Sequence, residues 1–317
     1  MEYRLLGKTG IRVSRLCFGV LTIGPLQAHL PLPEGVSIMR YAVERGVNFF
    51  DTAELYGTYP YLRELLHQVK GKDLVIASKS YAVSFEEMKR SVEKARRELD
   101  RDVIDIFLLH EQESELTLKG HRGALEYLIE AKSKGIIKAV GISTHHVAGV
   151  KAATAVPEIE VIHPLLNYTG LGIRDGSVED MVAAIVRASA AGKGVYLMKP
   201  LGGGNLISKA DTALKFAFSQ QAAAAVAVGM KSREEVEYNV LVASGLPVPE
   251  KIRRLVSRKR RRLHIEDWCE GCGECVQACP QEALFVGPQG KVQVREELCV
   301  LCGYCAAACP HFYIRVF

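Results

Sequence analysis

Eight of the nine cysteines in this 317-residue chain form two copies of one short pattern near the C-terminus. In each copy two residues separate the first three cysteines, three residues precede the fourth, and a proline follows it. The first copy contains Cys269, Cys272, Cys275 and Cys279, and the second contains Cys299, Cys302, Cys305 and Cys309. This spacing is typical of loops that bind [4Fe–4S] clusters through thiolates. We therefore predict two such clusters within residues 263–317.

Two other uses of clustered cysteines fit the sequence less well. Disulfide bonds occur mainly in exported proteins, and the residues after Met1 lack the apolar core of a signal peptide. Structural zinc sites need four ligands each, and these runs do not divide into separate Cys-x-x-Cys pairs. No apolar run reaches the length of a membrane span. We expect a cytoplasmic protein without a membrane span, and a buried Cys17.

Positive charge is concentrated just before the cysteine runs. Residues 251–262 carry eight lysines or arginines and no acid, whereas residues 263–317 carry seven acids and three bases. We predict that residues 246–262 form a basic linker helix that lies against the acidic C-terminal domain. Binding to nucleic acid or to an anionic membrane is the alternative. Because no aromatic residues alternate with these charges, we expect no nucleic-acid partner.

Apolar strand segments alternate with helical segments through the first 250 residues. Most of these segments are continuous apolar runs, as expected of parallel strands buried on both faces. The eight segments are residues 15–18, 47–50, 74–78, 104–109, 137–142, 159–163, 194–198 and 223–228. Eight repeats of this kind predict an α/β fold with a (β/α)8 TIM barrel over residues 1–245. A doubly wound open sheet is the alternative, but no Gly-x-Gly-x-x-Gly follows the first strand.

Four polar residues stand where barrel strands end. Asp51 ends the second strand, Tyr56 lies in the next loop, Lys79 ends the third strand and His110 ends the fourth. Catalytic groups of such barrels lie at these carboxyl ends, so the four side chains should converge. The set suits carbonyl reduction: Tyr56 would act as general acid, with a pKa lowered by Lys79. Each residue alone has a structural explanation, and their shared location favours catalysis.

Four segments carry a resemblance to a known family. They are Asp51-Thr-Ala-Glu-Leu-Tyr56-Gly, Val75-Ile-Ala-Ser-Lys79, Leu108-Leu-His110 and Val140-Gly-Ile-Ser143. Residues 1 to about 245 resemble the aldo-keto reductase superfamily, and the C-terminal extension is similar to the branch that carries a ferredoxin-like domain with two [4Fe–4S] clusters. The resemblance implies NAD(P)H-dependent reduction of a small aldehyde or ketone, with the four polar residues as a catalytic tetrad.

The cofactor site is predicted partly from loop chemistry and partly from the resemblance. A bare glycine backbone after the seventh strand can approach a pyrophosphate closely. Lys231 and Arg233 lie at the start of a helix predicted from the capping box of Ser232 and Glu235, where a phosphate would be stabilised. The predicted cofactor residues are Gly19, Ser143, Asn167, Met198, Lys199, Pro200, Leu201, Gly202, Gly203, Gly229, Met230, Lys231, Arg233, Glu235 and Asn239.

Several positions depart from the pattern that the resemblance implies. Glu235 stands where arginine or glutamine often binds the 2′-phosphate of NADP, so NADP and NAD both remain open. Met198 stands where an aromatic ring often stacks on the nicotinamide, and His163 stands where glutamine is common.

The resemblance to two-cluster ferredoxins also implies a crossed set of ligands, because the fourth cysteine of each run then serves the other cluster. The first cluster would use Cys269, Cys272, Cys275 and Cys309, and the second would use Cys299, Cys302, Cys305 and Cys279. Two strand pairs are predicted beside them, residues 284–286 with 291–294 and residues 263–265 with 314–316.

Two other functions remain open from the sequence. The clusters could exchange electrons with a ferredoxin or flavoprotein partner, or the barrel could sense nicotinamide without catalysis. Nicotinamide moves two electrons as hydride, whereas each cluster moves one, and the sequence shows no flavin motif that would connect them.

Overall fold

The computed structural model describes all residues except 26, 258–261, 280–281, 297, 300–303 and 317. Eight parallel strands close into a barrel in the order β10-β3-β4-β5-β6-β7-β8-β9. The strands are β3 (Leu16–Gly19), β4 (Phe49–Asp51), β5 (Val75–Ser80), β6 (Ile104–Leu109), β7 (Ile137–Thr144), β8 (Val161–Pro164), β9 (Gly194–Leu197) and β10 (Ala225–Gly229). The predicted (β/α)8 barrel is confirmed.

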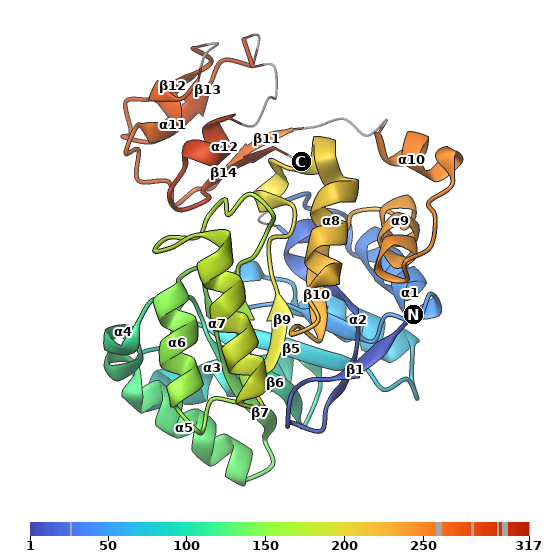
Figure 1. Cartoon of the computed structure of the whole chain (residues 1–317), viewed down its shortest axis with the longest axis vertical. Coiled ribbons are helices and arrows are strands. Elements are labelled where there is room, and N and C mark those ends of the chain that lie inside the picture. Colours follow the sequence, from blue (N-terminus) through green and yellow to red (C-terminus); the bar gives the residue numbers. More distant parts are fainter. Residues whose placement is uncertain (26, 258–261, 280–281, 297, 300–303, 317) are drawn as a thin grey trace.

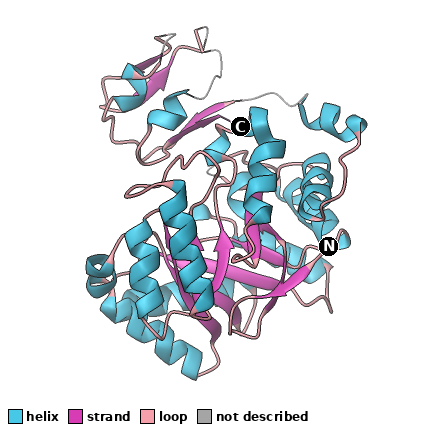
Figure 2. Cartoon of the chain, in the orientation of Figure 1, coloured by secondary structure: helices cyan, strands magenta, loops and turns pink. Residues whose placement is uncertain are grey.

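Helices surround the barrel on its outside (Figure 2). They are α1 (Leu32–Glu44), α2 (Tyr59–Gln68), α3 (Phe85–Leu99), α4 (Glu115–Gly120), α5 (Arg122–Ser133), α6 (Val147–Ala155), α7 (Val178–Ala190), α8 (Ala210–Ser219) and α9 (Arg233–Ala243). A capping box of Ser84 and Glu87 begins α3, and the buried side chains of Met88, Val92, Ala95 and Leu99 pack this helix against the core. The strands are therefore buried on both faces, which explains their continuous apolar runs.

The interior of the barrel is filled by side chains. Cys17, Phe49, Leu108 and Tyr196 belong to a central apolar cluster, and all four are fully buried. An N-terminal hairpin of β1 (Tyr3–Leu5) and β2 (Arg12–Ser14) adds residues to the same cluster. The predicted burial of Cys17 is confirmed. Because the interior is packed, chemistry is confined to the barrel mouth.

The linker helix differs from the prediction in what it contacts. Helix α10 (Glu250–Ser257) packs on α9, and its Ile252 and Val256 lie against the barrel core. Arg253 Nη1 lies 3.1 Å from Asp211 Oδ1 of helix α8. The expectation that this helix lies against the cluster domain is therefore wrong for its described part, which Figure 1 shows beside the barrel. Of the eight basic residues in the segment 251–262, the four at positions 258–261 lie outside the described residues.

The C-terminal cluster domain, residues 263–316, lies above the barrel mouth (Figure 1). Strand β11 (Leu263–Ile265) pairs with β14 (Ile314–Val316), and β12 (Leu284–Val286) pairs with β13 (Val292–Val294). Both predicted strand pairs are confirmed. Two short helices, α11 (Glu274–Gln277) and α12 (Tyr304–Ala308), complete the described part of this domain.

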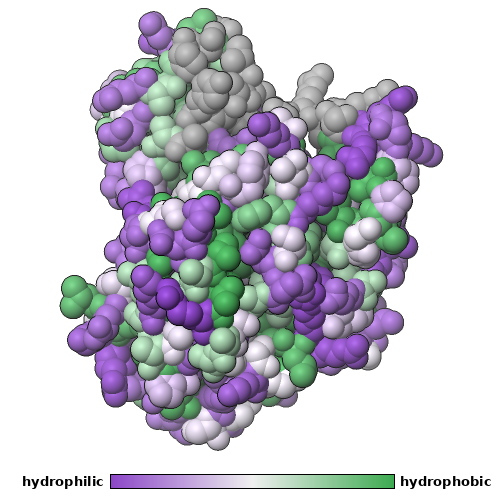
Figure 3. All heavy atoms as spheres, in the orientation of Figure 1, coloured by the Kyte–Doolittle hydropathy of each residue, from purple (hydrophilic) through white to green (hydrophobic). Residues whose placement is uncertain are grey.

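The outer surface carries hydrophilic and hydrophobic residues side by side on the face drawn in Figure 3. Among the helices of the described residues, none has the length and apolar character needed to cross a membrane.

Candidate active site

A buried ion pair lies at the floor of the barrel mouth. Lys79 Nζ donates to Asp51 Oδ1 at 2.9 Å, to Asp51 Oδ2 at 2.8 Å and to the carbonyl of Thr52 at 2.6 Å. The two residues meet because neighbouring strands β4 and β5 both end at this edge of the barrel. The three acceptors use all three protons of the ammonium group. Lys79 is therefore fixed in one position, with its charge compensated by Asp51.

Tyr196 is a member of this network that sequence reasoning missed. Its hydroxyl donates to Asp51 Oδ1 at 2.8 Å, and its ring stacks on His163 with centroids 3.8 Å apart. His163 Nδ1 meets the carbonyl of Tyr196 at 2.7 Å, and burial lowers the pKa of His163 to about 4. Tyr196 lies inside an apolar strand, so its sequence context indicated only a packed core residue. Alternation of inward and outward residues along β9 was the signal that could have found it.

Tyr56 lies directly above the ion pair. It ends the short helix η2 (Glu54–Tyr56), and Gly57 in the left-handed conformation turns the chain after it. Lys79 Nζ lies 5.1 Å from the centroid of its ring, and the edge of His110 meets the ring at a centroid distance of 5.9 Å. The four residues of the predicted tetrad are thus together in one site.

The acidity of Tyr56 differs from the expectation. Burial raises the pKa of Tyr56 well above its ordinary value, and the charges of Asp51 and Glu111 act in the same direction. The lowering expected from Lys79 is outweighed by burial and by these negative charges. Tyr56 therefore keeps its proton throughout the neutral range.

His110 presents an unsatisfied nitrogen in the same place. Burial, followed by the charge of Lys79, lowers the pKa of His110 well below its ordinary value, so the ring is neutral. Its Nδ1 is buried and meets no hydrogen-bond partner among the described residues. Tyr81 stacks on the other side of the ring at 4.2 Å. A buried polar atom without a partner is costly, which is consistent with a ligand atom occupying this position.

A cavity of about 680 Å³ opens beside Asp51, Tyr56 and His163. That volume lies within the usual range of small-molecule and cofactor sites. Ten of the predicted cofactor residues line it, namely Gly19, Met198, Lys199, Pro200, Leu201, Gly203, Gly229, Lys231, Glu235 and Asn239. Its wall includes the loop η3 (Gly202–Gly204), whose three glycines all have positive φ. That conformation is accessible to glycine and leaves a bare backbone facing the cavity.

Five predicted cofactor residues do not line this cavity: Ser143, Asn167, Gly202, Met230 and Arg233. Ser143 Oγ accepts from the amide of Glu111 at 2.9 Å. Asn167 Oδ1 accepts from the amides of Thr169 and Leu171 and shapes the loop after β8. Arg233 Nη2 donates to Ser37 Oγ at 2.7 Å, so its guanidinium extends toward helix α1.

The start of helix α9 forms as predicted, with one difference. Ser232 Oγ accepts from the amide of Glu235 at 3.2 Å, which confirms Ser232 as the N-cap. The carboxylate of Glu235 accepts from the amide of Lys231 at 2.7 Å. The predicted capping box, in which Glu235 would bond the amide of Ser232, is therefore only half formed. The alternative bond holds the carboxylate of Glu235 at the cavity wall.

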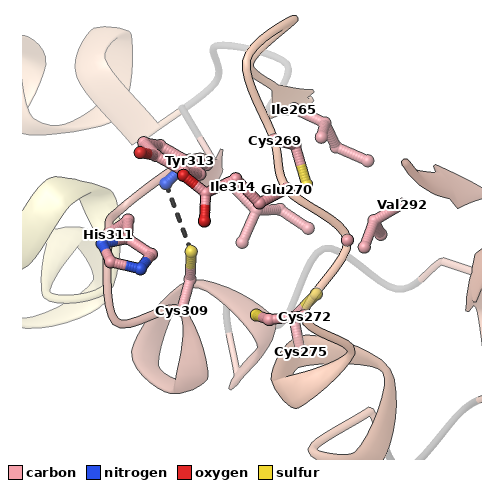
Figure 4. A pocket seen from close by; sticks show the side chains of 11 residues that line it. Ile265, Cys269, Glu270, Cys272, Cys275, Val292, Cys309, His311, Tyr313 and Ile314 are labelled. Carbon is pink, nitrogen blue, oxygen red and sulfur yellow. Dashed lines mark hydrogen bonds between the residues drawn. The ribbon is translucent and has the colours of Figure 1, made fainter. Parts of the chain in front are cut away.

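Four cysteines from both runs surround one small cavity in the cluster domain (Figure 4). They are the four predicted for the first cluster, Cys269, Cys272, Cys275 and Cys309. Within the described ranges no three histidine, cysteine or acidic side chains lie close enough to share one metal ion. A [4Fe–4S] cluster takes one thiolate per iron, so four cysteines around one cavity match the number of ligands that such a cluster needs. Of the second set, Cys302 lies outside the described residues.

The closed barrel, the buried pair of Lys79 and Asp51, and the phenol above it define an oxidoreductase of the (β/α)8 class with an added iron–sulfur domain. The model of the aldo/keto reductase family matches residues 15–212, and that of a 4Fe-4S dicluster domain matches residues 268–312. The chain belongs to the aldo-keto reductase family and carries a 4Fe-4S domain at its C-terminal side.

Known proteins agree with this assignment. L-galactose dehydrogenase of Arabidopsis thaliana is 26% identical over 292 residues, covering 78% of this chain and 89% of the relative. The 6-dehydroglucose reductase of Novosphingobium aromaticivorans is 26% identical over 268 residues, covering 76% and 82%. A solved structure of a Pseudomonas aeruginosa protein assigned to the aldo-keto reductases superposes with a TM-score of 0.66. It is 26% identical, and the match covers 77% of this chain and 95% of that one.

Proposed function

We propose that the barrel reduces an aldehyde or ketone with NAD(P)H and that Tyr56 is the general acid. The observation that carries the proposal is the contact of the Tyr56 ring, at the barrel mouth, with both His110 and the ammonium of Lys79, where His110 Nδ1 is left without a partner among the described residues. A carbonyl oxygen placed there would meet a proton donor and a neutral imidazole at once. Both are groups that stabilise negative charge as it forms on the oxygen.

Each residue has a distinct role in this proposal. Bound nicotinamide supplies the hydride. Tyr56 holds its proton at Oη until the carbonyl oxygen becomes basic, and then donates it. Lys79 stabilises the phenolate that remains, because its position is fixed by Asp51. His110 orients the substrate oxygen.

The residues of the large cavity are proposed to hold the cofactor. The backbone of Gly203 and Gly229 would lie against the pyrophosphate, and Lys231 and Glu235 would lie near the adenosine. The carboxylate of Glu235 supports a preference for NADH, because it would repel the 2′-phosphate of NADPH. Its hydrogen bond to the amide of Lys231 keeps that charge at the cavity.

The crossed cysteine sets are proposed to hold two [4Fe–4S] clusters, which supply one-electron transfer when bound. Electron exchange with a ferredoxin or flavoprotein is a second proposed function. It is supported by the exposure of Cys272, which leaves one ligand of the first cluster accessible to a partner.

The catalytic proposal is tested by replacing Tyr56 with phenylalanine. We expect Tyr56→Phe to lower kcat by about a hundredfold or more, since this is the usual contribution of a general acid. NADH affinity should stay unchanged. Tyr3→Phe is the matched control, because its hydroxyl bonds the carbonyl of Gly46 far from the cavity. Unchanged turnover in Tyr56→Phe would refute the assignment.

A further inference from the structure

The wall of the active-site cavity is not made by the barrel alone. Phe312 and Arg315 of the cluster domain line the same cavity as Asp51 and Tyr56. Phe312 follows the ligand cysteine Cys309 by three residues, and Arg315 lies in β14. Neither residue was among the predicted site residues, and both are over nine-tenths buried.

The ring of Phe312 packs closely against two glycines of the barrel. A side chain at Gly172 would come within 2.3 Å of its ring, and one at Gly203 would come within 3.0 Å. Lys199 Nζ lies 4.1 Å from the ring centroid, a distance typical of a cation–π contact. Arg174 Nη1 also donates to the carbonyl of Pro310 at 2.8 Å. These contacts fix the position of the cluster domain at the barrel mouth.

Arg315 is a buried cation with spare hydrogen-bonding capacity. Its guanidinium is paired with Glu266, the residue that follows β11. Its Nε is buried and has no acceptor in the part of the chain that the structure describes. Burial lowers the pKa of Arg315 to about 10, and the charge of Arg315 in turn opposes the raised pKa of Tyr56. A guanidinium with one unsatisfied nitrogen therefore lies within electrostatic reach of the proposed general acid.

Lys199 adds a second positive charge to the same wall. Burial lowers the pKa of Lys199 to about 8, with Glu111 acting in the opposite direction and Arg315 in the same one. No described residue forms an ion pair with Lys199 within 4 Å. Two cations against one cavity favour an anionic ligand, and the planar fork of arginine is suited to a carboxylate.

We propose that Arg315 is a specificity-determining residue that selects carbonyl substrates bearing a carboxylate, so that the cluster domain completes the substrate site. The proposal rests on the reductase function proposed above. Glu266 and Arg315 are both close in sequence to predicted ligands of the first cluster. Cys269 lies three residues after Glu266, and Cys309 lies six residues before Arg315. The competing explanation is structural: Arg315 serves only to join β14 to Glu266.

The test compares two aldehydes, one charged and one neutral, that differ only in esterification of a carboxylate, in the full-length, cluster-loaded protein. They are 4-carboxybenzaldehyde and its methyl ester, assayed at the same pH. A charge-assisted hydrogen bond should give the acid an advantage of about ten- to a hundredfold in kcat/KM. Arg315→Gln should abolish this advantage. Because Arg315→Gln leaves Glu266 buried without its partner, the double variant Glu266→Gln/Arg315→Gln is tested beside it.

The matched control is Arg295→Gln in the same domain. Arg295 Nη1 bonds the carbonyl of Glu282, and Arg295 does not line the cavity. We expect this variant to keep the advantage of the acid. We also expect the double variant to bind NADH and NADPH as the wild type does, which separates a substrate carboxylate from the cofactor diphosphate.

One result would overturn the proposal, namely an acid-to-ester ratio that stays at the wild-type value in the double variant. If NADH and NADPH binding is weaker in the same variant, Arg315 is assigned to the cofactor diphosphate instead. Binding of benzoate and benzamide, measured by calorimetry, does not need turnover. Loss of the preference for benzoate in the double variant would support Arg315 even if neither aldehyde is reduced, an outcome that refutes only the reductase function.

Discussion

Lys79 and Asp51 form a two-pronged ion pair, with Nζ 2.9 Å and 2.8 Å from the two carboxylate oxygens and both side chains almost fully buried. A pair of this kind constrains stability as well as chemistry, because removal of one partner leaves the other charge without compensation.

Replacement of Lys79 should therefore affect stability and turnover separately. We expect Lys79→Met to cost about 3–5 kcal/mol in the free energy of unfolding, since Asp51 remains buried and charged. The double variant Asp51→Leu/Lys79→Met should recover much of that loss and stay inactive. Urea unfolding followed by circular dichroism, together with kcat, checks both points. Turnover in Lys79→Met would show that the phenol acts without the lysine.

Cofactor preference should respond to the charge of Glu235. We expect Glu235→Gln to raise the ratio of kcat/KM for NADPH to that for NADH by about tenfold, equivalent to about 1.4 kcal/mol. The amide can still accept from Lys231. Glu237→Gln is the matched control on the same helix, since Glu237 pairs with Arg45 away from the cavity. Equal ratios in the two variants would remove Glu235 from the cofactor site.

Acid should destabilise the barrel through its buried histidines. Burial lowers the pKa of His163 from 6.5 to about 4. Between these two pH values the unfolded chain therefore binds a proton at His163 and the folded chain does not. The contribution of neutral His163 to the free energy of unfolding is fully present above pH 6.5 and is lost as the pH falls toward 4. Between pH 6.5 and 5 the loss amounts to about 2 kcal/mol.

The histidine prediction is checked by urea unfolding at several pH values. His163→Gln should make the curve less steep between pH 6.5 and 4 without making it flat, because the pKa of buried His110 is lowered as well. His67→Gln should leave it unchanged, because His67 is exposed and pairs with Asp100 on the surface. A wild-type curve that is already flat in this interval would contradict the assignment.

Crossed ligation makes a distinctive prediction for cysteine variants. We expect Cys269→Ser and Cys309→Ser, alone or together, to impair the same cluster, whereas Cys279→Ser combined with Cys309→Ser should impair both. The cause is that Cys309 lies with Cys269, Cys272 and Cys275 around one cavity. Iron content and electron paramagnetic resonance of the reduced protein measure the result. Cys17→Ala, inside the barrel, should keep the full iron content. Separate losses in the Cys269 and Cys309 variants would instead mean that each run closes on itself.

The sequence was sufficient for the barrel because its strands are buried on both faces and its helices carry capping signals. Strand β6 begins and ends at the predicted residues. Asp51, Lys79 and His110 could be placed at the barrel mouth because each stands at the end of a buried strand, and Tyr56 because it lies in the loop that follows β4. The hydrogen bond from Tyr196 to Asp51 could not be predicted in the same way, since it joins residues 145 positions apart that meet only when the barrel closes.

The position of the cluster domain on the barrel could not be predicted from the sequence, for a related reason. The cysteine spacing specifies a local loop, but the contact of Phe312 with Gly172 and Gly203 depends on how two folded units meet. Arg233 illustrates the same limit on a smaller scale. Its position at a helix start suggested a phosphate ligand, yet its length lets it reach Ser37 on α1.

The glycines beneath Phe312 have a consequence for how this protein can be dissected. A barrel produced without residues 263–317 would lose the Phe312 ring that covers Gly172 and Gly203, and Lys199 would become open to water. Such a fragment would differ from the intact protein in the shape and charge of its catalytic opening. Impaired reduction by the fragment would therefore carry no information about electron flow, whereas single substitutions at the cysteines would.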